Sequence, residues 1–276
     1  MHLLPHATSI TEMIPEQQLK IIFVHGACHG AWTWYKVEAA LRSEGHSVLT
    51  LDLAASGVNE KRMVEDVFTF AEYSQPLMQT LAELPEGEKA VLVGHSLGGL
   101  NLAFAMETFP EKIAVAVFVT AFMPDTVSPP PYVFSKLGES ISAVAWMDTE
   151  FEEVRVPERE EPFFTMLFGP QFMGKHLYQL CAPEDLALAN SLVRTGSLFQ
   201  EDLKKAPILS KEGYGSVDKV YIICKQDAAI TEDYQRWMIS NNQVKEVMEI
   251  EADHMVMLSR PQELCKHLIS VLHKYI

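Results

Sequence analysis

Short apolar runs alternate with longer amphipathic stretches along much of this 276-residue chain. The runs are rich in Val, Ile and Leu, and they predict buried β-strands over 21–24, 48–51, 89–93, 113–120, 220–224 and 247–250. The stretches between them predict helices over 31–43, 68–84, 100–107, 232–240 and 261–275. Continuous apolar strands separated by helices indicate an α/β fold with a mostly parallel, doubly wound sheet, which binds its ligand at the carboxyl ends of the strands.

The alternation is interrupted between residues 122 and 215, which predicts a helical cap inserted after one strand. Three consecutive prolines, Pro129–Pro131, mark its boundary, and 186–193 is a good helix former. The dense apolar cluster 163–168 predicts cap core, with two or three members facing a ligand. Residues 1–19 are interpreted as a poorly ordered extension that precedes the main domain, 20–276.

The segment Gly94–Gly99 holds the most specific chemical signal in the chain. It reads G-x-S-x-G between a predicted strand and a predicted helix, the pattern of a nucleophile elbow. Glycines at the two flanking positions allow a turn too tight for side chains. The pattern therefore predicts that Ser96 lies exposed at the carboxyl edge of the sheet as a nucleophile.

A serine nucleophile needs a base, and the base needs an orienting acid, in the chain order Ser, acid, His for this kind of elbow. His254 follows the last predicted strand by a short loop and is the candidate base. Asp227 follows the preceding strand and is the preferred acid, with Asp125, after the strand 113–120, as the competitor. Asp253 adjoins the base, but successive side chains diverge.

Two backbone N–H donors are needed to stabilise an oxyanion. One is expected from Leu97, which follows the nucleophile, and the other from Ala27, in the turn after the first strand. Gly26 lets that turn approach the serine closely. His25 and His95 precede their turns and are expected to make structural hydrogen bonds.

Composition narrows the class of protein further. A formal net charge of −15 argues against nucleic acid and anionic membranes as partners. Residues 2–19 lack the pattern of a signal peptide, and no apolar run approaches the ~20 residues that span a bilayer. The four cysteines show no metal-ligand spacing and fit reduced thiols in a cytoplasmic protein.

Four segments together resemble the plant methylesterase family, which includes the salicylic-acid-binding methylesterase, polyneuridine aldehyde esterase and plant hydroxynitrile lyases. They are His25–Trp32, Leu51–Gly57, Gly94–Gly99 and Asp253–Met255, and the resemblance extends from residue 22 to residue 275. It implies an α/β-hydrolase fold with a helical cap, no metal, no cofactor and often a homodimer.

The resemblance also implies roles for particular residues. It places the triad on Ser96, Asp227 and His254, and the oxyanion donors on Ala27 and Leu97. The pocket positions that it implies are Phe122, Trp146, Met166 and Leu198. The sequence departs from the family pattern at Glu152–Arg159 and in the neighbours of the acid, Lys225–Ala229.

The candidate triad predicts a serine carboxylesterase, and the resemblance implies that it cleaves methyl esters of small, mostly apolar plant metabolites, either phytohormone or alkaloid and iridoid esters. A β-keto or β-formyl acid product would then lose carbon dioxide spontaneously. The first alternative is a hydroxynitrile lyase on the same scaffold. Such lyases resemble this chain but carry a polar residue in place of Gly26 and a lysine in place of Met255, so both positions favour the esterase. The second alternative is a ligand-binding protein without turnover.

Overall fold

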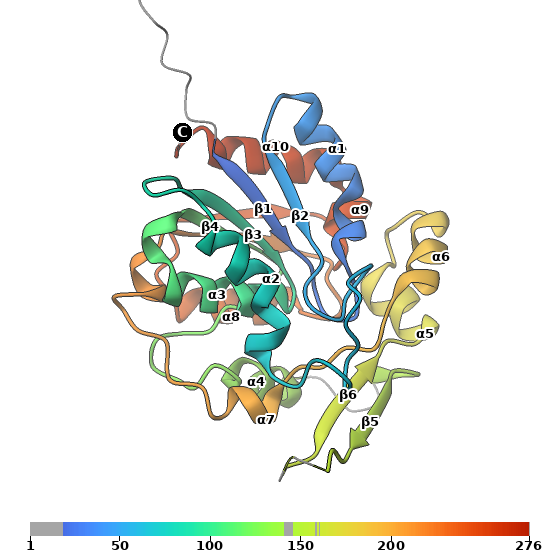
Figure 1. The fold of residues 1–276 in the computed structure, drawn as a ribbon. Coiled ribbons are helices and arrows are strands. Elements are labelled where there is room, and N and C mark those ends of the chain that lie inside the picture. Colours follow the sequence, from blue (N-terminus) through green and yellow to red (C-terminus); the bar gives the residue numbers. More distant parts are fainter. Residues whose placement is uncertain (1–18, 141–145, 158, 160, 276) are drawn as a thin grey trace, which may run out of the picture.

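A computed structural model describes residues 19–140, 146–157, 159 and 161–275. Its centre is a parallel six-stranded sheet with the strand order β2-β1-β3-β4-β7-β8 (Figure 1). The strands are β1 (Lys20–Val24), β2 (Val48–Leu51), β3 (Ala90–His95), β4 (Ile113–Val119), β7 (Lys219–Cys224) and β8 (Glu246–Ile250). The predicted doubly wound parallel sheet is confirmed.

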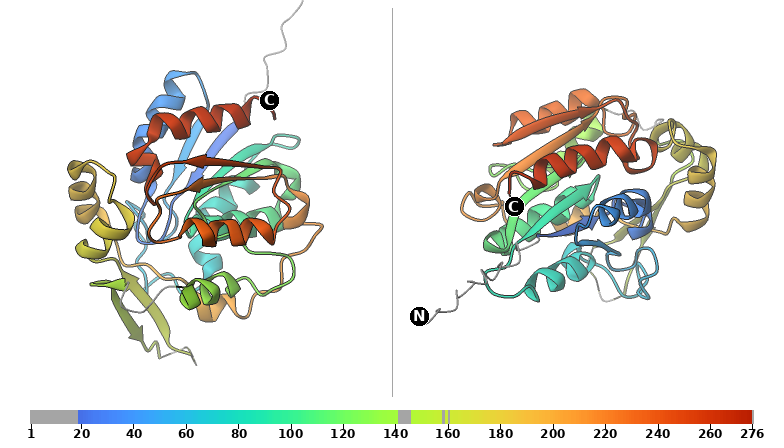
Figure 2. Two further views of the ribbon diagram at one scale, coloured as in Figure 1. Left: turned by 180° about the vertical axis from the view of Figure 1, so that it is seen from behind. Right: turned by 90° about the horizontal axis from the view of Figure 1, so that it is seen from above.

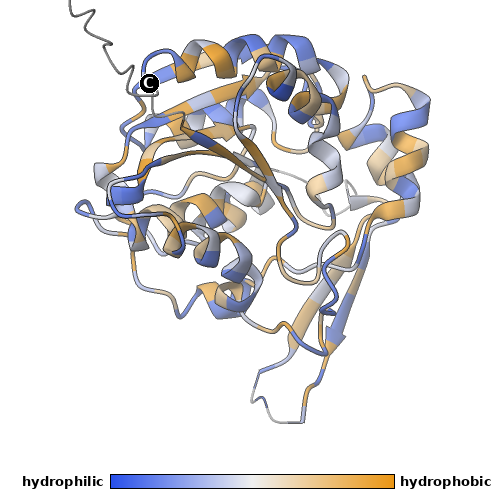
Figure 3. Ribbon diagram, turned by 45° about the horizontal axis from the view of Figure 1, so that its top comes forward, coloured by the Kyte–Doolittle hydropathy of each residue, from blue (hydrophilic) through white to orange (hydrophobic). Residues whose placement is uncertain are grey.

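Both faces of the sheet are covered by helices, so successive residues of a strand enter different cores. In β1, Ile21 and Phe23 belong to one hydrophobic cluster, whereas Ile22 and Val24 belong to the other. The first cluster includes residues of α1 (Tyr35–Ser43), α9 (Val256–Ser259) and α10 (Pro261–Leu272). The second includes residues of α2 (Phe70–Ala82), α3 (Gly98–Thr108) and α8 (Glu232–Ser240), and the two layers are visible in Figure 2. Figure 3 shows the strands between them as largely hydrophobic.

The helix boundaries differ slightly from those predicted. The predicted helix 31–43 is a 3₁₀ turn, Ala31–Trp34, followed by α1. Helix α2 begins after a capping box, in which the Thr69 side chain accepts the Glu72 N–H and Glu72 accepts the Thr69 N–H, and it continues through Pro76. The final predicted helix ends at Leu272 rather than Tyr275.

The insertion between β4 and β7 contains helices together with an antiparallel strand pair that the sequence analysis did not predict. Its helices are α4 (Tyr132–Ser140), α5 (Pro170–Phe172), α6 (Pro183–Leu192) and α7 (Gln200–Leu203), with a π-helical turn at Met173–Leu177 and a 3₁₀ turn at Tyr214–Ser216. A further 3₁₀ turn, Pro110–Lys112, lies outside the insertion, just before β4. Strands β5 (Glu150–Val154) and β6 (Phe163–Leu167) form a ribbon that projects from one side of the molecule (Figure 1). The cluster 163–168 thus begins as a strand, whose buried Phe163 and Thr165 flank the exposed Phe164.

Two predictions from the sequence concern the N-terminal extension and membrane-spanning segments. The predicted extension, apart from Leu19, lies outside the described residues. Among the helices that the structure describes, none is long and apolar enough to cross a membrane.

Candidate active site

Ser96 lies in the tight turn between β3 and α3, as the sequence pattern predicts. Its backbone φ is +53°, in the left-handed region that L-residues rarely adopt. A Cβ added at Gly94 would lie 2.8 Å from Leu102 Cδ1, and one added at Gly98 would lie 2.7 Å from the Val24 carbonyl oxygen. The flanking glycines are therefore required by packing against the helix and the neighbouring strand.

Asp227 and His254 meet at the carboxyl ends of β7 and β8. His254 Nδ1 donates a hydrogen bond of 2.6 Å to Asp227 Oδ2, and both side chains are buried. Thr120 Oγ1, at the end of β4, donates to the same oxygen, at 2.5 Å. The other oxygen, Oδ1, accepts the backbone N–H groups of Ala229 and Ile230 at 2.7 and 2.8 Å. The carboxylate is thus fixed on both sides.

The competing carboxylates have other partners. Asp125 Oδ1 accepts the N–H groups of Val127 and Ser128, a local turn interaction. Asp253 accepts the Leu180 N–H at 2.8 Å and the Ser259 hydroxyl at 2.6 Å. Of the three candidate acids, Asp227 is the one that contacts His254.

His95 links the serine turn to the His254 loop. Its Nε2 lies 2.9 Å from the His254 carbonyl oxygen, which can only accept, so this nitrogen carries the proton. The two imidazole rings are 4.5 Å apart, centroid to centroid. Burial holds the pKa of His95 well below its ordinary value, so the ring is neutral.

His25 orients the turn after β1. Its Nε2 accepts the Leu53 N–H at 3.1 Å, so the ring proton is on Nδ1, which donates to the Gly26 carbonyl at 2.8 Å. In a trans peptide the C=O and N–H groups point in opposite directions. Because the Gly26 carbonyl faces His25, the N–H of Ala27, in the same peptide unit, points away from it. As predicted, His25 and His95 both make structural hydrogen bonds.

His29 connects the same turn to the cap, a role the sequence analysis missed. Its Nδ1 donates to the Ala27 carbonyl at 2.8 Å, and its Nε2 accepts the Tyr178 hydroxyl at 2.7 Å. The partners are 149 residues apart, so the local sequence carries no signal for this contact. Burial lowers the pKa of His29 to about 4.

The lowered pKa of His29 predicts that the folded protein becomes less stable in acid. Since unfolded histidine titrates near 6.5 and folded His29 near 4, the unfolded chain binds the extra proton between these pH values. We expect the contribution of His29 to the free energy of unfolding to be fully present above pH 6.5 and to fall by roughly 3 kcal/mol as the pH drops to about 4. Urea unfolding at several pH values measures it. Between pH 6.5 and 4 the free energy of unfolding should depend less steeply on pH in a His29→Gln variant than in a variant of the exposed His273. Equal pH dependence in the two variants would contradict the role given to His29.

A cavity of about 240 Å³ opens above the serine. Ser96, His254, Ala27 and Leu97 line it, and so do the four predicted pocket residues, Phe122, Trp146, Met166 and Leu198. Further apolar walls come from Phe134, Phe168, Phe172 and Ile230. Met166 and Phe168 are the members of the 163–168 cluster that border it. We call this space the inner cavity.

Two predicted substrate-contacting residues lie elsewhere. Met255 is fully buried in the core that contains α10 and is not among the residues that line the inner cavity. Gly26 also lies behind the lining, where an added Cβ would be 2.9 Å from Ser96 Cβ. Gly26 packs against the serine and Met255 packs in the core beside α10, so their contact with substrate stays a prediction that their place outside this lining does not support.

Comparison with known proteins identifies the class. A model of the alpha/beta hydrolase family matches residues 21–267. Salicylic acid-binding protein 2 of Nicotiana tabacum is 51% identical over 255 residues, covering 92% of this chain and 97% of that protein. Methylesterase 1 of Arabidopsis thaliana is 52% identical over 256 residues, covering 92% and 96%. The chain belongs to the alpha/beta hydrolase family, and these relatives place it among the ester hydrolases of that family.

A solved structure agrees with this assignment. The crystal structure of polyneuridine aldehyde esterase superimposes with a TM-score of 0.89 at 46% sequence identity, covering 92% of this chain and 99% of that one. The resemblance to plant methylesterases is therefore confirmed, and so is the predicted α/β-hydrolase fold.

Proposed function

We propose that this protein hydrolyses methyl esters of small plant metabolites, with Ser96 as nucleophile, His254 as base and Asp227 as orienting acid. The observation that carries the proposal is the 2.6 Å bond between His254 Nδ1 and Asp227 Oδ2, in a site where His254 and Ser96 border one cavity. An Asp-oriented histidine beside an elbow serine is the arrangement that acyl transfer requires.

The reaction takes place in two halves. Ser96 Oγ attacks the ester carbonyl as His254 Nε2 accepts its proton, and the tetrahedral intermediate expels methanol, which takes that proton. Water, activated by the same imidazole, then attacks the acyl-serine and releases the acid. Asp227 keeps the proton of the neutral ring on Nδ1, which leaves Nε2 free to accept.

The N–H groups of Ala27 and Leu97 are the proposed donors to the oxyanion, and both residues border the inner cavity. The Ala27 donor depends on how its peptide is turned. His25 holds the Gly26 carbonyl on the opposite side of that peptide, and a hydrogen bond to the carbonyl also polarises the N–H. We infer that His25 is a positioning residue for the oxyanion hole.

Removing this hydrogen bond should slow the reaction. We expect His25→Leu to lower kcat by up to roughly 10²-fold, with little change in KM. This fall in kcat should not exceed the fall caused by complete loss of one oxyanion donor. His25→Asn keeps an N–H donor near the Nδ1 position and should recover most of the rate. Steady-state kinetics on one ester measures both. An Asn variant as slow as the Leu variant would contradict the positioning role.

The inner cavity favours an apolar substrate of modest size, because its walls are mainly aromatic and aliphatic. Phytohormone and alkaloid or iridoid methyl esters both have this character, and a β-keto acid product would decarboxylate without further catalysis. We expect the enzyme to act in the cytoplasm and to form a homodimer.

A panel of methyl esters tests the proposal. We expect the purified protein to release acid and methanol in equal amounts from at least one ester, as measured by mass spectrometry. The alternative chemistry, cyanohydrin cleavage, is tested with mandelonitrile in the same assay. Cyanide release above the uncatalysed rate, with no turnover of any ester, would contradict the proposal.

A further inference from the structure

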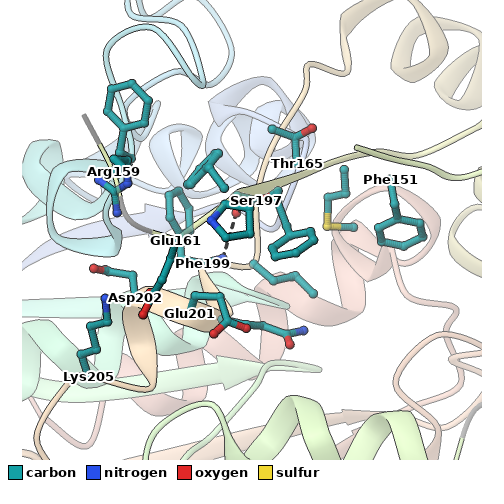
Figure 4. A pocket seen from close by; sticks show the side chains of 16 residues that line it. Phe151, Arg159, Glu161, Thr165, Ser197, Phe199, Glu201, Asp202 and Lys205 are labelled. Atoms are coloured by element: carbon teal, nitrogen blue, oxygen red, sulfur yellow. Dashed lines mark hydrogen bonds and ion pairs between the residues drawn. The ribbon is translucent and has the colours of Figure 1, made fainter. Parts of the chain in front are cut away.

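A second cavity of about 290 Å³ lies beside the inner one and has no part in the chemistry described so far. It is formed by the β5–β6 ribbon, the segment Ser197–Gln200 and Phe68, and we call it the outer cavity (Figure 4). Four residues border both cavities, namely Phe151, Met166, Leu198 and Gln200. A single layer of residues therefore separates the outer cavity from the space above Ser96.

The side chains of this layer are carried by a backbone that hydrogen bonds hold in place. The Met166 backbone is fixed, because its N–H and carbonyl both bond to Gly196, at 2.9 and 2.8 Å. Its side chain is unbranched and adapts readily to a neighbour's shape. Leu198 and Gln200 are also able to change rotamer. The barrier between the cavities is thus made partly of adaptable side chains on a fixed frame.

The walls of the outer cavity are aromatic and held in place. Phe163 packs edge-on against Phe68 and Phe199, with ring centroids 5.9 and 5.8 Å apart. Phe199 has a φ of +50°, and its N–H donates to Ser197 Oγ at 2.9 Å. That hydroxyl in turn donates to the Phe164 carbonyl at 2.7 Å. A strained turn tied to β6 in this way presents a preformed apolar surface.

Charged side chains gather at the end of the outer cavity away from Phe151 (Figure 4). Lys205 pairs with Glu161 at 2.7 Å, and the Arg159 guanidinium lies 5.5 Å from the centre of the Phe68 ring. Asp202 accepts the Phe70 N–H at 2.8 Å. Since these charges have local partners and are of both signs, the cavity favours an uncharged ligand, apolar near Phe151 and able to carry a polar group at its far end.

We propose that the outer cavity binds the distal part of an elongated, uncharged acyl group whose methyl ester lies at Ser96. The inference rests on the proposed esterase function and narrows its substrate class. At about 240 Å³ the inner cavity is smaller than the ~300–1,000 Å³ typical of small-molecule sites, whereas the two cavities joined fall within that range. An ester that spans both would displace the side chains of Met166 and Leu198.

Methyl esters of ω-phenylalkanoic acids of increasing chain length test this inference. We expect kcat/KM to rise by about threefold to fourfold for each methylene that enters the outer cavity.

Phe164 borders only the outer cavity and is half-exposed, so it can be replaced without disturbing the core. Phe164→Ser should lower kcat/KM for long esters by about tenfold and leave methyl phenylacetate nearly unchanged. Ile208→Ser, at an equally exposed apolar position away from both cavities, should change neither.

Binding of the product acids, followed by calorimetry, separates this inference from the esterase proposal. If no ester is hydrolysed, the esterase proposal fails, but a long acid that binds more tightly than phenylacetic acid and is selectively weakened by Phe164→Ser would still support the outer cavity. Equal kcat/KM and equal acid binding for short and long chains would overturn the inference. An equal effect of Phe164→Ser on short and long chains would also overturn it.

Discussion

Ser96→Ala should abolish methyl ester hydrolysis while leaving the fold unchanged. The variant removes only the Oγ atom, at a residue that is already in the strained turn conformation. Loss of a triad serine lowers kcat by roughly 10⁴- to 10⁶-fold, because the residual rate comes only from binding and the oxyanion hole. The measurement is acid release under saturating ester, with circular dichroism to show that the protein is folded.

A matched serine provides the control. Ser191 is exposed on α6 and donates only to the Ala187 carbonyl, so Ser191→Ala should hydrolyse the ester at the wild-type rate. Activity of Ser96→Ala within tenfold of the wild type would refute its role as nucleophile.

Asp227→Asn should lower kcat nearly as much as Ser96→Ala, because of the hydrogen bonds that the Asp227 carboxylate accepts. Oδ1 accepts two backbone N–H groups, so the amide oxygen of asparagine would occupy that place. The NH₂ group would then face His254 Nδ1 and force the ring proton onto Nε2. A histidine in this tautomer cannot accept the serine proton, and we expect kcat to fall by about 10⁴-fold.

Asp125→Asn is the matched control, because an asparagine oxygen can still accept the N–H groups of Val127 and Ser128. It should leave kcat close to the wild-type value. If the two variants showed the reverse order of activity, Asp125 rather than Asp227 would be the acid.

The parts of the fold that sequence predicts well are those with a local, repeated signal. The alternation of apolar strands and amphipathic helices predicts the sheet. The strands are apolar throughout because their successive side chains pack into the two hydrophobic cores on opposite faces. The candidate residues Ser96, Asp227 and His254 follow from the rule that side chains just after parallel strands share one sheet edge.

The parts that sequence misses depend on contacts distant in the chain. Strand β5 is charged and exposed on both faces, and only its pairing with the apolar β6 makes it a strand. The Thr120 and Tyr178 contacts to Asp227 and His29 span 107 and 149 residues. Met255 adjoins the predicted base, yet a short helix, α9, starts at the next residue, and the Met255 side chain is buried in the core.

Titration with a serine-directed organophosphate, followed by peptide mass spectrometry, tests the central claim most directly. At each dose the fraction of Ser96 that carries the adduct is compared with the remaining rate of methyl ester hydrolysis. We predict that activity falls in proportion to labelling of Ser96 and reaches zero when one adduct per chain has formed. Hydrolysis that persists when Ser96 is fully labelled, or an adduct that forms on another residue as activity is lost, would contradict the account.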